Sequence, residues 1–426
     1  MHSSHSIGRR AFLNSSLCAG AAFAAPCFIP GAVLGKDGAV PPSEKIVMGA
    51  IGIGGRGSYV IGCFLEQADV RFVANCDVRE ERREGTKHRI DQHYGTRDCT
   101  AYRDFRDLLA RVDIDAVLIT TGSNWHALLS ILASKAGKDV YCEKPCSKTI
   151  VESIALADAF RRSARVFQGG MQRRSLPHFQ FAADLAQRGK LGKLHTVYAH
   201  PGGLGTRTSG WLTPQPEPSQ ERLDWDLYLG TAPWRPFNAA QLGAEFEKGG
   251  GLTGGGCLEW GSHCVDQCQW ANSADDTVPV EYYPLENGQA SALYANGVKL
   301  VLRETGWLPL GSCPVRYEGS TGWVETADDG RIEVSSPALL AGKKVPVIPG
   351  YPATPHVRNF LDCVKTRAAT RVTAQIACQS HIACHATNVA IHLGRKLAYD
   401  PKKNEFVGDD EANRYRGEAL RDPWRF

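Results

Sequence analysis

Hydrophobic and polar positions follow two different patterns along the chain. From residue 46 to about residue 170, short apolar runs such as Ile46–Ile51 and Val70–Cys76 alternate with segments whose apolar residues recur three and four positions apart, as between residues 60 and 65. Strands that alternate with helices in this way predict a mostly parallel, doubly wound α/β sheet. We therefore expect a first domain over residues 45–170.

The pattern changes after residue 170. Residues 277–350 alternate apolar and polar positions between turn signals such as Asn296-Gly297, which predicts an antiparallel sheet. We expect an α+β domain with a large, mostly antiparallel open sheet over residues 171–350, and C-terminal helices and a tail over residues 351–426. Residues 201–240 have little regular pattern and contain three tryptophans. They predict an ordered lid over a sugar site, with a packing or oligomer surface as the alternative.

The first 35 residues predict an export signal. The sequence Arg9-Arg10-Ala11-Phe12-Leu13 precedes an alanine-rich apolar run over residues 19–25. This arrangement resembles a twin-arginine signal peptide over residues 1–35, with residues 36–44 as a linker. It implies a periplasmic or otherwise exported protein that has the twin-arginine export machinery as a partner. An ordinary Sec signal or a disordered tail is the alternative.

Composition and charge narrow the functional classes. The formal net charge is +4 and no basic block stands out, which argues against nucleic acid as a main partner. Beyond residue 45 no apolar run reaches the length of a membrane span, and Cys18 and Cys27 lack a lipobox, so we expect no membrane anchor. The 14 cysteines lie mostly in core-like segments, and we predict no obligatory disulfide framework.

A glycine-rich turn connects the first predicted strand to the first predicted helix. Residues 52–57 read G-I-G-G-R-G, a G-x-G-x-x-G spacing that lets the backbone approach a pyrophosphate at a helix N-terminus. The motif alone is weak evidence for nucleotide binding, because 44 of the 426 residues are glycine and this spacing can arise by chance. The flanking strands and Asp77, at the end of the second strand, strengthen it. Asp77 favours NAD by accepting a hydrogen bond from the adenosine ribose, and Arg79 keeps NADP as an alternative.

Three more segments of the first domain carry a family resemblance. They are residues 121–126, residues 136–145 with the sequence Glu143-Lys144-Pro145 at their end, and residues 169–175. With the glycine turn they resemble the Gfo/Idh/MocA family, the glucose–fructose oxidoreductase and inositol dehydrogenase relatives, from about residue 45 to the C-terminus. The motif and the resemblance imply a Rossmann domain that contacts a dinucleotide through Gly52, Ile53, Gly54, Gly55, Arg56, Gly57, Asp77, Thr121, Asn124, His126, Glu143, Lys144 and Gln172.

A second chemical cluster is predicted on a helix near residue 260. Glu259, His263 and Asp266 are spaced i, i+4 and i+7, which places them on one helix face. They resemble the family's D-x-x-x-H-x-x-D element, in which the histidine is the acid/base and the carboxylates hold the substrate and the histidine. Glu259 departs from the usual aspartate. We expect these three residues and Lys144 to be catalytic; the alternatives are a core histidine, a salt-bridged acid and a surface lysine.

These residues together predict an exported NAD(P)-dependent oxidoreductase that acts on a sugar or polyol by hydride transfer. Because an exported enzyme cannot draw on free NAD, we expect a tightly bound cofactor. An NAD-dependent glycoside hydrolase that uses transient oxidation and elimination is one alternative, and a catalytically silent carbohydrate-binding protein is another. The resemblance implies a homodimer or homotetramer through the C-terminal sheet. His381 and His385 have helical spacing for zinc, but no ligand set is complete, so we predict no metal.

Overall fold

The computed structural model describes residues 40–204, 212–243 and 255–426. It divides into two compact units, Met1–Lys45 and Ile46–Phe426. The predicted signal peptide and most of the predicted linker lie outside the described residues, so the twin-arginine signal stays a prediction. In the first unit the described element is a short 3-10 helix, η3 (Pro42–Glu44). The second unit contains both predicted domains.

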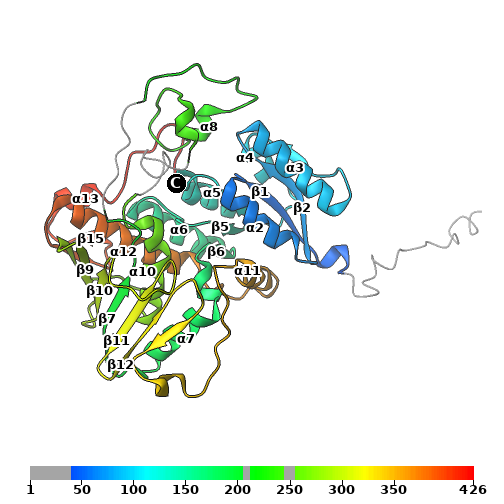
Figure 1. Cartoon of the computed structure of the whole chain (residues 1–426). Coiled ribbons are helices and arrows are strands. Elements are labelled where there is room, and N and C mark those ends of the chain that lie inside the picture. Colours follow the sequence, from blue (N-terminus) through cyan, green and yellow to red (C-terminus); the bar gives the residue numbers. More distant parts are fainter. Residues whose placement is uncertain (1–39, 205–211, 244–254) are drawn as a thin grey trace, which may run out of the picture. The chain divides into compact units, whose positions relative to one another are not determined.

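A six-stranded parallel sheet forms the N-terminal half of the second unit (Figure 1). Its strand order is β3-β2-β1-β4-β5-β6, with the first βαβ unit at the centre. The strands are β1 (Ile46–Ile51), β2 (Val70–Cys76), β3 (Thr100–Tyr102), β4 (Ala116–Ile119), β5 (Asp139–Cys142) and β6 (Phe167–Gly169). The prediction of a doubly wound Rossmann sheet is confirmed, because all five strand pairs are parallel and each crossover between them follows the βαβ arrangement.

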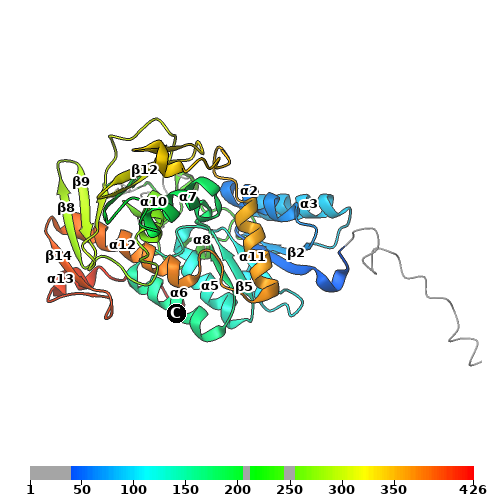
Figure 2. The ribbon, with the colours of Figure 1, turned by 90° about the horizontal axis from the view of Figure 1, so that it is seen from below.

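Helices cover both faces of this sheet (Figure 2). One face packs against α2, α3 and α11, and the other face packs against α4, α5 and α6. These helices are α2 (Gly55–Leu65), α3 (Glu80–Tyr94), α4 (Phe105–Leu109), α5 (Ser123–Lys135), α6 (Ile150–Ser163) and α11 (Thr354–Thr366). The C-terminal part of the chain therefore completes the core of the N-terminal sheet; Phe360 of α11 meets Phe64 of α2 edge to face, with ring centroids 6.1 Å apart.

Local sequence explains where these helices begin and end. The carboxylate of Asp104 accepts a hydrogen bond from the backbone N–H of Arg106 and caps α4. Thr149 caps α6 in the same way. Gly137 follows α5 with φ +79°, a left-handed conformation that costs glycine little and that stops the helix before β5.

The second sheet has nine strands in the order β13-β12-β11-β7-β10-β9-β8-β14-β15. Every pair is antiparallel except β10 with β7, so the predicted mostly antiparallel open sheet is confirmed. The strands are β7 (Leu194–Ala199), β8 (Glu281–Glu286), β9 (Gln289–Leu293), β10 (Lys299–Leu302), β11 (Val315–Gly319), β12 (Gly322–Thr326), β13 (Ile332–Val334), β14 (Leu397–Asp400) and β15 (Glu405–Phe406).

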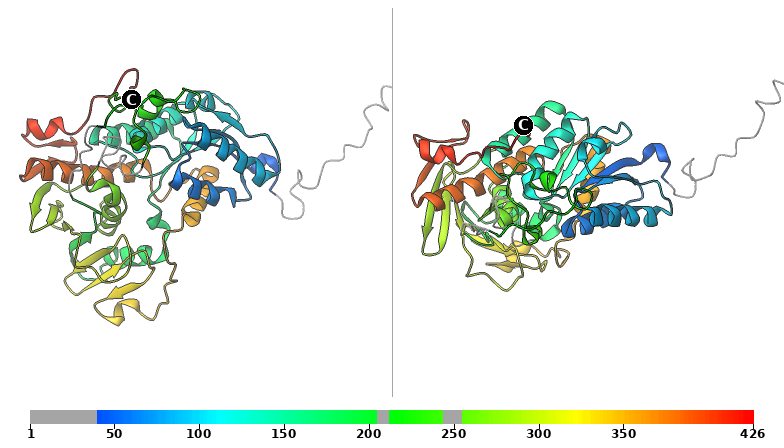
Figure 3. Two further views of the ribbon diagram at one scale, coloured as in Figure 1. Left: turned by 45° about the horizontal axis from the view of Figure 1, so that its top comes forward. Right: turned by 90° about the horizontal axis from the view of Figure 1, so that it is seen from above.

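Three helices pack on one face of the second sheet: α7 (Pro177–Gln187), α10 (Leu258–Ala271) and α12 (Ala374–Leu393). Helix α12 also packs against α6, so it joins the cores of the two sheets (Figure 3). The shorter helices are η4 (Gln172–Ser175), α8 (Trp225–Leu229), η5 (Ala239–Leu242), η6 (Pro337–Leu340) and α13 (Asp410–Arg414). Among the described residues, no helix has both the length and the apolar character needed to span a bilayer.

Candidate active site

The glycine turn between β1 and α2 is tightly enclosed. Gly52 has φ +73°, and a Cβ there would lie 2.3 Å from Cγ2 of Thr121. A Cβ on Gly57 would lie 2.2 Å from Oγ1 of Thr120, whose hydroxyl donates to the Gly52 carbonyl at 2.7 Å. Neither position has room for a side chain, so the turn needs glycine for close packing of the helix on the strand. The first N–H groups of α2 are thereby left facing the site of an anion.

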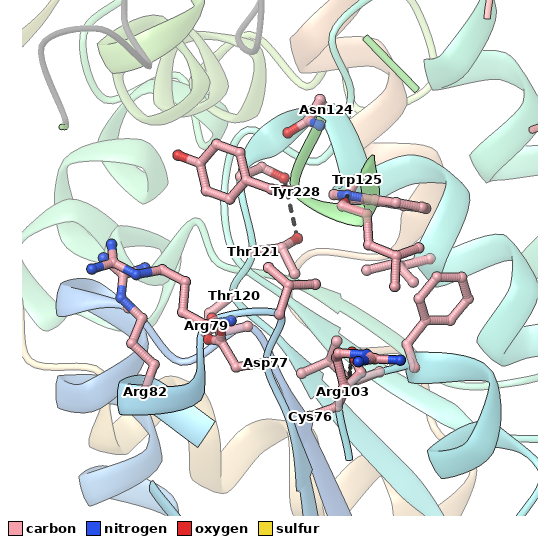
Figure 4. A pocket seen from close by; sticks show the side chains of 18 of the residues that line it. Cys76, Asp77, Arg79, Arg82, Arg103, Thr120, Thr121, Asn124, Trp125 and Tyr228 are labelled. Atoms are coloured by element: carbon pink, nitrogen blue, oxygen red, sulfur yellow. Dashed lines mark hydrogen bonds between the residues drawn. The ribbon is translucent and has the colours of Figure 1, made fainter. Parts of the chain in front are cut away.

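A cavity of about 400 Å³ opens beside this turn (Figure 4). Its lining includes seven of the predicted cofactor residues: Gly52, Gly54, Gly55, Arg56, Asp77, Thr121 and Asn124. It lies at the carboxyl ends of β1, β2 and β4, the place where parallel α/β sheets bind ligands. The side-chain-free turn and the acid at the end of β2 fit the adenosine and diphosphate part of a dinucleotide.

Asp77 lies at the far end of this cavity and is 6% exposed. One of its carboxylate oxygens accepts a hydrogen bond from the backbone N–H of Arg79 at 2.9 Å. Burial raises the pKa of the Asp77 carboxyl, against the lowering effect of that N–H and of the nearby Arg82 guanidinium. The Asp77 carboxylate is therefore held in place beside the guanidinium groups of Arg79 and Arg82. It lines the cavity, where it can accept a hydrogen bond from a ribose hydroxyl.

His126 does not line the cavity. Its ring is buried, with Nδ1 2.7 Å from the Pro145 carbonyl oxygen and Nε2 3.0 Å from the Thr121 carbonyl oxygen. Burial lowers the pKa of His126 to about 4. The ring holds the loop after β4 against the loop after β5, and its contact with the cofactor stays a prediction.

Glu143, Lys144 and Gln172 lie at the other end of the glycine turn. The Arg56 guanidinium donates to Oε1 of Glu143 at 3.4 Å, and the backbone N–H of Lys144 donates to Oε2 at 3.2 Å. With its amide oriented to satisfy its neighbours, Gln172 accepts a hydrogen bond from Arg56 at 2.7 Å. Arg56 thus connects the glycine turn to the loop that carries Lys144.

The side chain of Lys144 contacts the first turn of α10, the helix that carries the other three predicted catalytic residues. Its ammonium donates to the backbone carbonyl of Glu259 at 2.8 Å and lies 3.7 Å from the Glu259 carboxylate. Both side chains are about one quarter exposed. The Lys144 ammonium also lies 6.0 Å from the ring centroid of Trp260. These contacts bring the two predicted catalytic segments together.

His263 lies one helical turn beyond Glu259 and is 4% exposed. Its Nδ1 is buried and has no hydrogen-bond partner among the described residues. Burial, and then the positive charges of Arg173, Lys144 and Arg56, hold the pKa of the imidazole well below its ordinary value. The ring is therefore neutral at physiological pH, which is the form that accepts a proton.

Asp266 is placed differently from Glu259 and His263. It is fully buried, and both its oxygens accept hydrogen bonds from the Arg174 guanidinium at 2.8 Å. Ser380 of α12 also donates to it at 2.8 Å, and Arg174 makes a second ion pair with Asp275. The surroundings of Asp266 therefore differ from those of Glu259 and His263, although all three residues lie on one helix face. Asp266 anchors α10 to its neighbours through Arg174 and Ser380, and its catalytic role stays a prediction.

Sequence reasoning missed Arg173, Trp260 and Tyr351. The buried Arg173 guanidinium is paired with Asp328 and lies 5.8 Å from the Trp260 ring centroid and 4.9 Å from that of Tyr351. Tyr351 also faces Arg56, at 5.5 Å. Trp260 was detectable as the exposed neighbour of Glu259. Tyr351 gave no signal, because its segment reaches the site only through the tertiary fold.

His381 and His385 lie in the buried part of α12. Nε2 of His381 accepts a hydrogen bond from the backbone N–H of Cys146 at 2.9 Å, so His381 supports the loop that carries Lys144. Within the described residues no group of three or more His, Cys, Asp and Glu side chains is arranged to hold a metal ion. The 12 cysteines in the described part of the chain are buried and free.

The long segment predicted as a sugar lid lies partly outside the described residues, including Trp211. Trp225 is 2% exposed and packs on Tyr228 and Phe237, so it is a packing residue. Trp234 is 61% exposed. The described residues 219–242 lie over the nucleotide cavity, where Leu227, Tyr228 and Leu242 contribute to its lining.

Comparison with known protein families shows to which family this chain belongs. Residues 46–171 match the Gfo/Idh/MocA model described as an oxidoreductase family with an NAD-binding Rossmann fold. Residues 206–302 and 330–426 match the C-terminal alpha/beta domain of the same oxidoreductase family. The chain belongs to the Gfo/Idh/MocA family. Its first domain is therefore an NAD-binding domain, as its motifs indicated.

Curated relatives match between a third and two fifths of the chain. Myo-inositol 2-dehydrogenase of Thermotoga maritima is 28% identical over 150 residues, 35% of this chain and 43% of that protein. A glycosyl hydrolase family 109 protein of Shewanella baltica is 30% identical over 176 residues, 38% of each chain. The chain thus spans about two fifths of the length of these relatives.

Solved structures share the fold over most of the chain. The aldose-aldose oxidoreductase of Caulobacter crescentus, complexed with glycerol, has a TM-score of 0.60 at 20% identity, covering 83% of this chain and 99% of that one. The WlbA dehydrogenase of Chromobacterium violaceum, in complex with NADH and UDP-GlcNAcA, has a TM-score of 0.63 at 17% identity, covering 84% and 96%. At these identities the likeness concerns the fold.

Proposed function

We propose that the protein oxidises a hydroxyl group of a sugar or polyol with NAD(P) as the hydride acceptor. The observation that carries this proposal is the contact of Lys144 with Glu259, one helical turn before His263 and connected to the glycine turn through Arg56 and Glu143. This arrangement supports the proposal that an ammonium and a neutral imidazole act at the nicotinamide end of the nucleotide site.

Each group has a distinct task in such a reaction. A nicotinamide bound at this end supplies a carbon that accepts a hydride from the substrate. His263 accepts the proton of the reacting hydroxyl, since its depressed pKa keeps the imidazole neutral. Lys144 donates a hydrogen bond to the same oxygen and stabilises the negative charge that develops there. General acid–base help of this kind accelerates a reaction about 10²–10⁴-fold.

The remaining groups of the cluster position the substrate and the machinery. The Glu259 carboxylate is partly exposed and accepts a hydrogen bond from a second substrate hydroxyl, while its carbonyl holds Lys144. Trp260, which is 36% exposed, offers an apolar face to the C–H side of a sugar ring. Asp266 fixes the direction of α10, and hence of His263, from inside the core.

Export and cofactor retention are part of the same proposal. A twin-arginine signal in residues 1–35 would carry the folded protein, with its nucleotide, to the periplasm. The nucleotide then has to be regenerated on the protein, so a second sugar or carbonyl compound reoxidises it. Assembly through the open face of the nine-stranded sheet is the corresponding proposal for the oligomer.

A second candidate is an NAD-dependent glycoside hydrolase, favoured by the 30% identity with the glycosyl hydrolase family 109 protein. Transient oxidation of a sugar hydroxyl acidifies the neighbouring C–H, elimination then expels the aglycone, and water addition and reduction complete the cycle. The same groups, Lys144 and His263, would serve it. No net oxidation occurs, which suits a retained cofactor.

One set of measurements separates these candidates. Mass spectrometry identifies the nucleotide that co-purifies with the full-length protein, and a sugar panel is then tested with and without a carbonyl acceptor. Aryl-glycoside cleavage without net NADH indicates the hydrolase, and dependence on an acceptor indicates the oxidoreductase. A protein that holds no dinucleotide, and whose activity is untouched by His263→Ala, contradicts both.

A further inference from the structure

Residues 219–242, called the clasp below, run along the rim of the nucleotide cavity. Leu223 forms an antiparallel bridge with Arg79, directly after β2. The backbone N–H of Asp224 donates to the Val78 carbonyl at 3.1 Å, and that of Glu80 donates to the Arg222 carbonyl at 3.0 Å. The clasp therefore continues the backbone pairing of the loop that carries Asp77.

The clasp is also bonded to the first turn of α5, which follows the loop after β4 on the other side of the cavity. The indole N–H of Trp125 donates to the Leu227 carbonyl at 2.7 Å, and the Asn124 amide donates to the Leu229 carbonyl at 2.8 Å. Gly230 lies flat against the Trp125 indole, since a Cβ there would come within 2.2 Å of the ring. The clasp thus bridges two loops that flank the cavity and are more than 40 positions apart in the sequence.

The clasp supplies an apolar wall to one end of the cavity. Leu227, Tyr228 and Leu242 line it together with Phe105 and Trp125 of the first domain. Tyr228 lies across the cavity from Asp77 in Figure 4. Its ring is stacked on Trp225, with centroids 5.2 Å apart and planes at 14°. Because Asp77 marks the ribose of the adenosine half, this wall faces the adenine ring, which is flat and apolar on both faces.

The C-terminal residues 421–424, called the latch below, hold the clasp from outside. The Arg421 guanidinium donates to the Gly230 carbonyl at 3.0 Å and to the Asp226 carbonyl at 2.7 Å, and it pairs with the Asp226 carboxylate. Trp424 is 7% exposed and meets the Trp125 ring at 4.7 Å. The chain end lies close to α8 in Figures 1 and 3, as these contacts require.

We propose that the clasp binds the adenine end of the dinucleotide and that the latch keeps it closed, so that the cofactor leaves only when the latch opens. This inference rests on the proposed NAD(P) chemistry and adds the groups that retain the cofactor. Opening breaks the Arg421 hydrogen bonds and uncovers Trp424 and Trp125 together. Local openings of this kind have a free-energy cost set by the contacts they break, and that cost slows release.

Two latch variants test the rate of release. NADH-loaded protein is mixed with excess NAD, and the loss of bound NADH fluorescence gives the release rate. Arg421→Gln and Trp424→Ala are expected to accelerate release at least tenfold. The matched control is Arg414→Gln, which makes the same charge change at an exposed residue of α13, and it is expected to stay within twofold of the wild type. Equal release rates in all four proteins overturn the proposal.

A third variant tests the adenine contact directly and does not touch the latch. Tyr228→Ala is expected to weaken 5′-AMP binding at least tenfold and to leave nicotinamide mononucleotide binding within twofold. Equal effects on the two half-ligands, or none on either, contradict the clasp even if the latch variants fail to fold. A wild-type protein that binds neither NADH nor NAD contradicts the proposed function itself, so the two failures are distinguishable.

Discussion

The Lys144 ammonium donates a hydrogen bond of 2.8 Å to the backbone carbonyl of Glu259, a residue 115 positions later in the chain. This contact joins the loop after β5 in the first domain to the first turn of α10 in the second. It orients the ammonium without consuming the Glu259 carboxylate, which stays 3.7 Å away and partly exposed. The proposed reaction therefore depends on both domains.

Removing the Lys144 ammonium should abolish most turnover and leave nucleotide binding in place. We expect Lys144→Gln to lower kcat by about 10²-fold or more, because the developing oxyanion loses its charged donor. Lys144→Arg should recover only part of the loss, since a planar guanidinium cannot repeat the contact with the Glu259 carbonyl. Lys135→Gln, at the exposed end of α5, is the control. A near-normal kcat for Lys144→Gln would remove this residue from the mechanism.

The pH dependence of turnover should reflect the depressed pKa of His263. A base whose pKa lies well below its ordinary value near 6.5 stays neutral as the pH falls, so kcat/KM for oxidation should hold its plateau below pH 6.5. Arg56→Gln removes one of the positive charges that depress this pKa and should move the acid limb to higher pH. A limb that stays fixed in this variant would assign the titration to another group.

Asp266 and Asp275 offer a test of the buried ion pair with Arg174. Asp266→Asn should cost about 3–5 kcal/mol of unfolding free energy, because it leaves a buried guanidinium without its enclosed partner. Asp275 has a side chain 36% exposed, and Asp275→Asn should cost about 1 kcal/mol or less. Denaturant unfolding of the two variants measures the difference. Similar losses would mean that Asp266 does not anchor α10.

Glu152 should make the wild type less stable as the pH rises. Burial raises its pKa from 4.5 to about 7 in the folded protein, so between these values the unfolded chain loses its proton first. Stability is therefore lost from about pH 4.5 to pH 7, by up to about 3 kcal/mol, and the loss levels off above pH 7. Glu152→Gln lacks this titration. The unfolding free energies of the two proteins are measured at pH 5 and pH 8. The wild type should lose more stability than Glu152→Gln between these pH values, and an equal change in both proteins would contradict the prediction.

Arg82 should influence the choice between NAD and NADP. Its guanidinium acts on the Asp77 carboxyl and reaches to within 3.1 Å of the position a Cβ would take on Gly54. In Figure 4 Arg79 and Arg82 extend to one side of Asp77, with Arg103 on the other side. A cation there offers a partner for a 2′-phosphate. Arg82→Gln should lower the bound NADP:NAD ratio about tenfold after incubation with equal excesses of both.

The control for Arg82 lies on the same helix. Arg89 follows it by seven residues, about two turns of α3, and its guanidinium donates to the Ser58 carbonyl outside the cavity. Arg89→Gln makes the same charge change and should leave the ratio within twofold of the wild type. If both variants shift the ratio equally, the effect belongs to overall charge and not to a local phosphate contact.

Structural features that depend on contacts between residues near one another in the chain could be predicted from the sequence. The turn at residues 52–57 follows from glycine conformation and from the strands around it, and the Asp104 cap follows from a contact two residues away. Asp266 shows the limit of this reasoning. Helical spacing places Asp266 on the same helix face as His263. That its carboxylate accepts hydrogen bonds from Arg174 and Ser380 follows only from the tertiary fold.

The clasp could not be predicted because its partners are distant in sequence. Its composition, rich in proline and tryptophan, indicated a functional segment. The backbone pairing of Leu223 with Arg79 follows from a tertiary contact that leaves no periodic signal in either segment. The same is true of Tyr351, which is brought between Arg56 and Arg173 by the segment that leads into α11.

The position of α11 has a consequence for the order of events during synthesis. One face of the nucleotide-binding sheet is covered by α2 and α3 and is completed by residues 354–366. A ribosome must therefore synthesise the segment up to residue 366 before that face is shielded from water. Binding of a dinucleotide by the completed fold is then a late step, because α11 is made long after the glycine turn between β1 and α2.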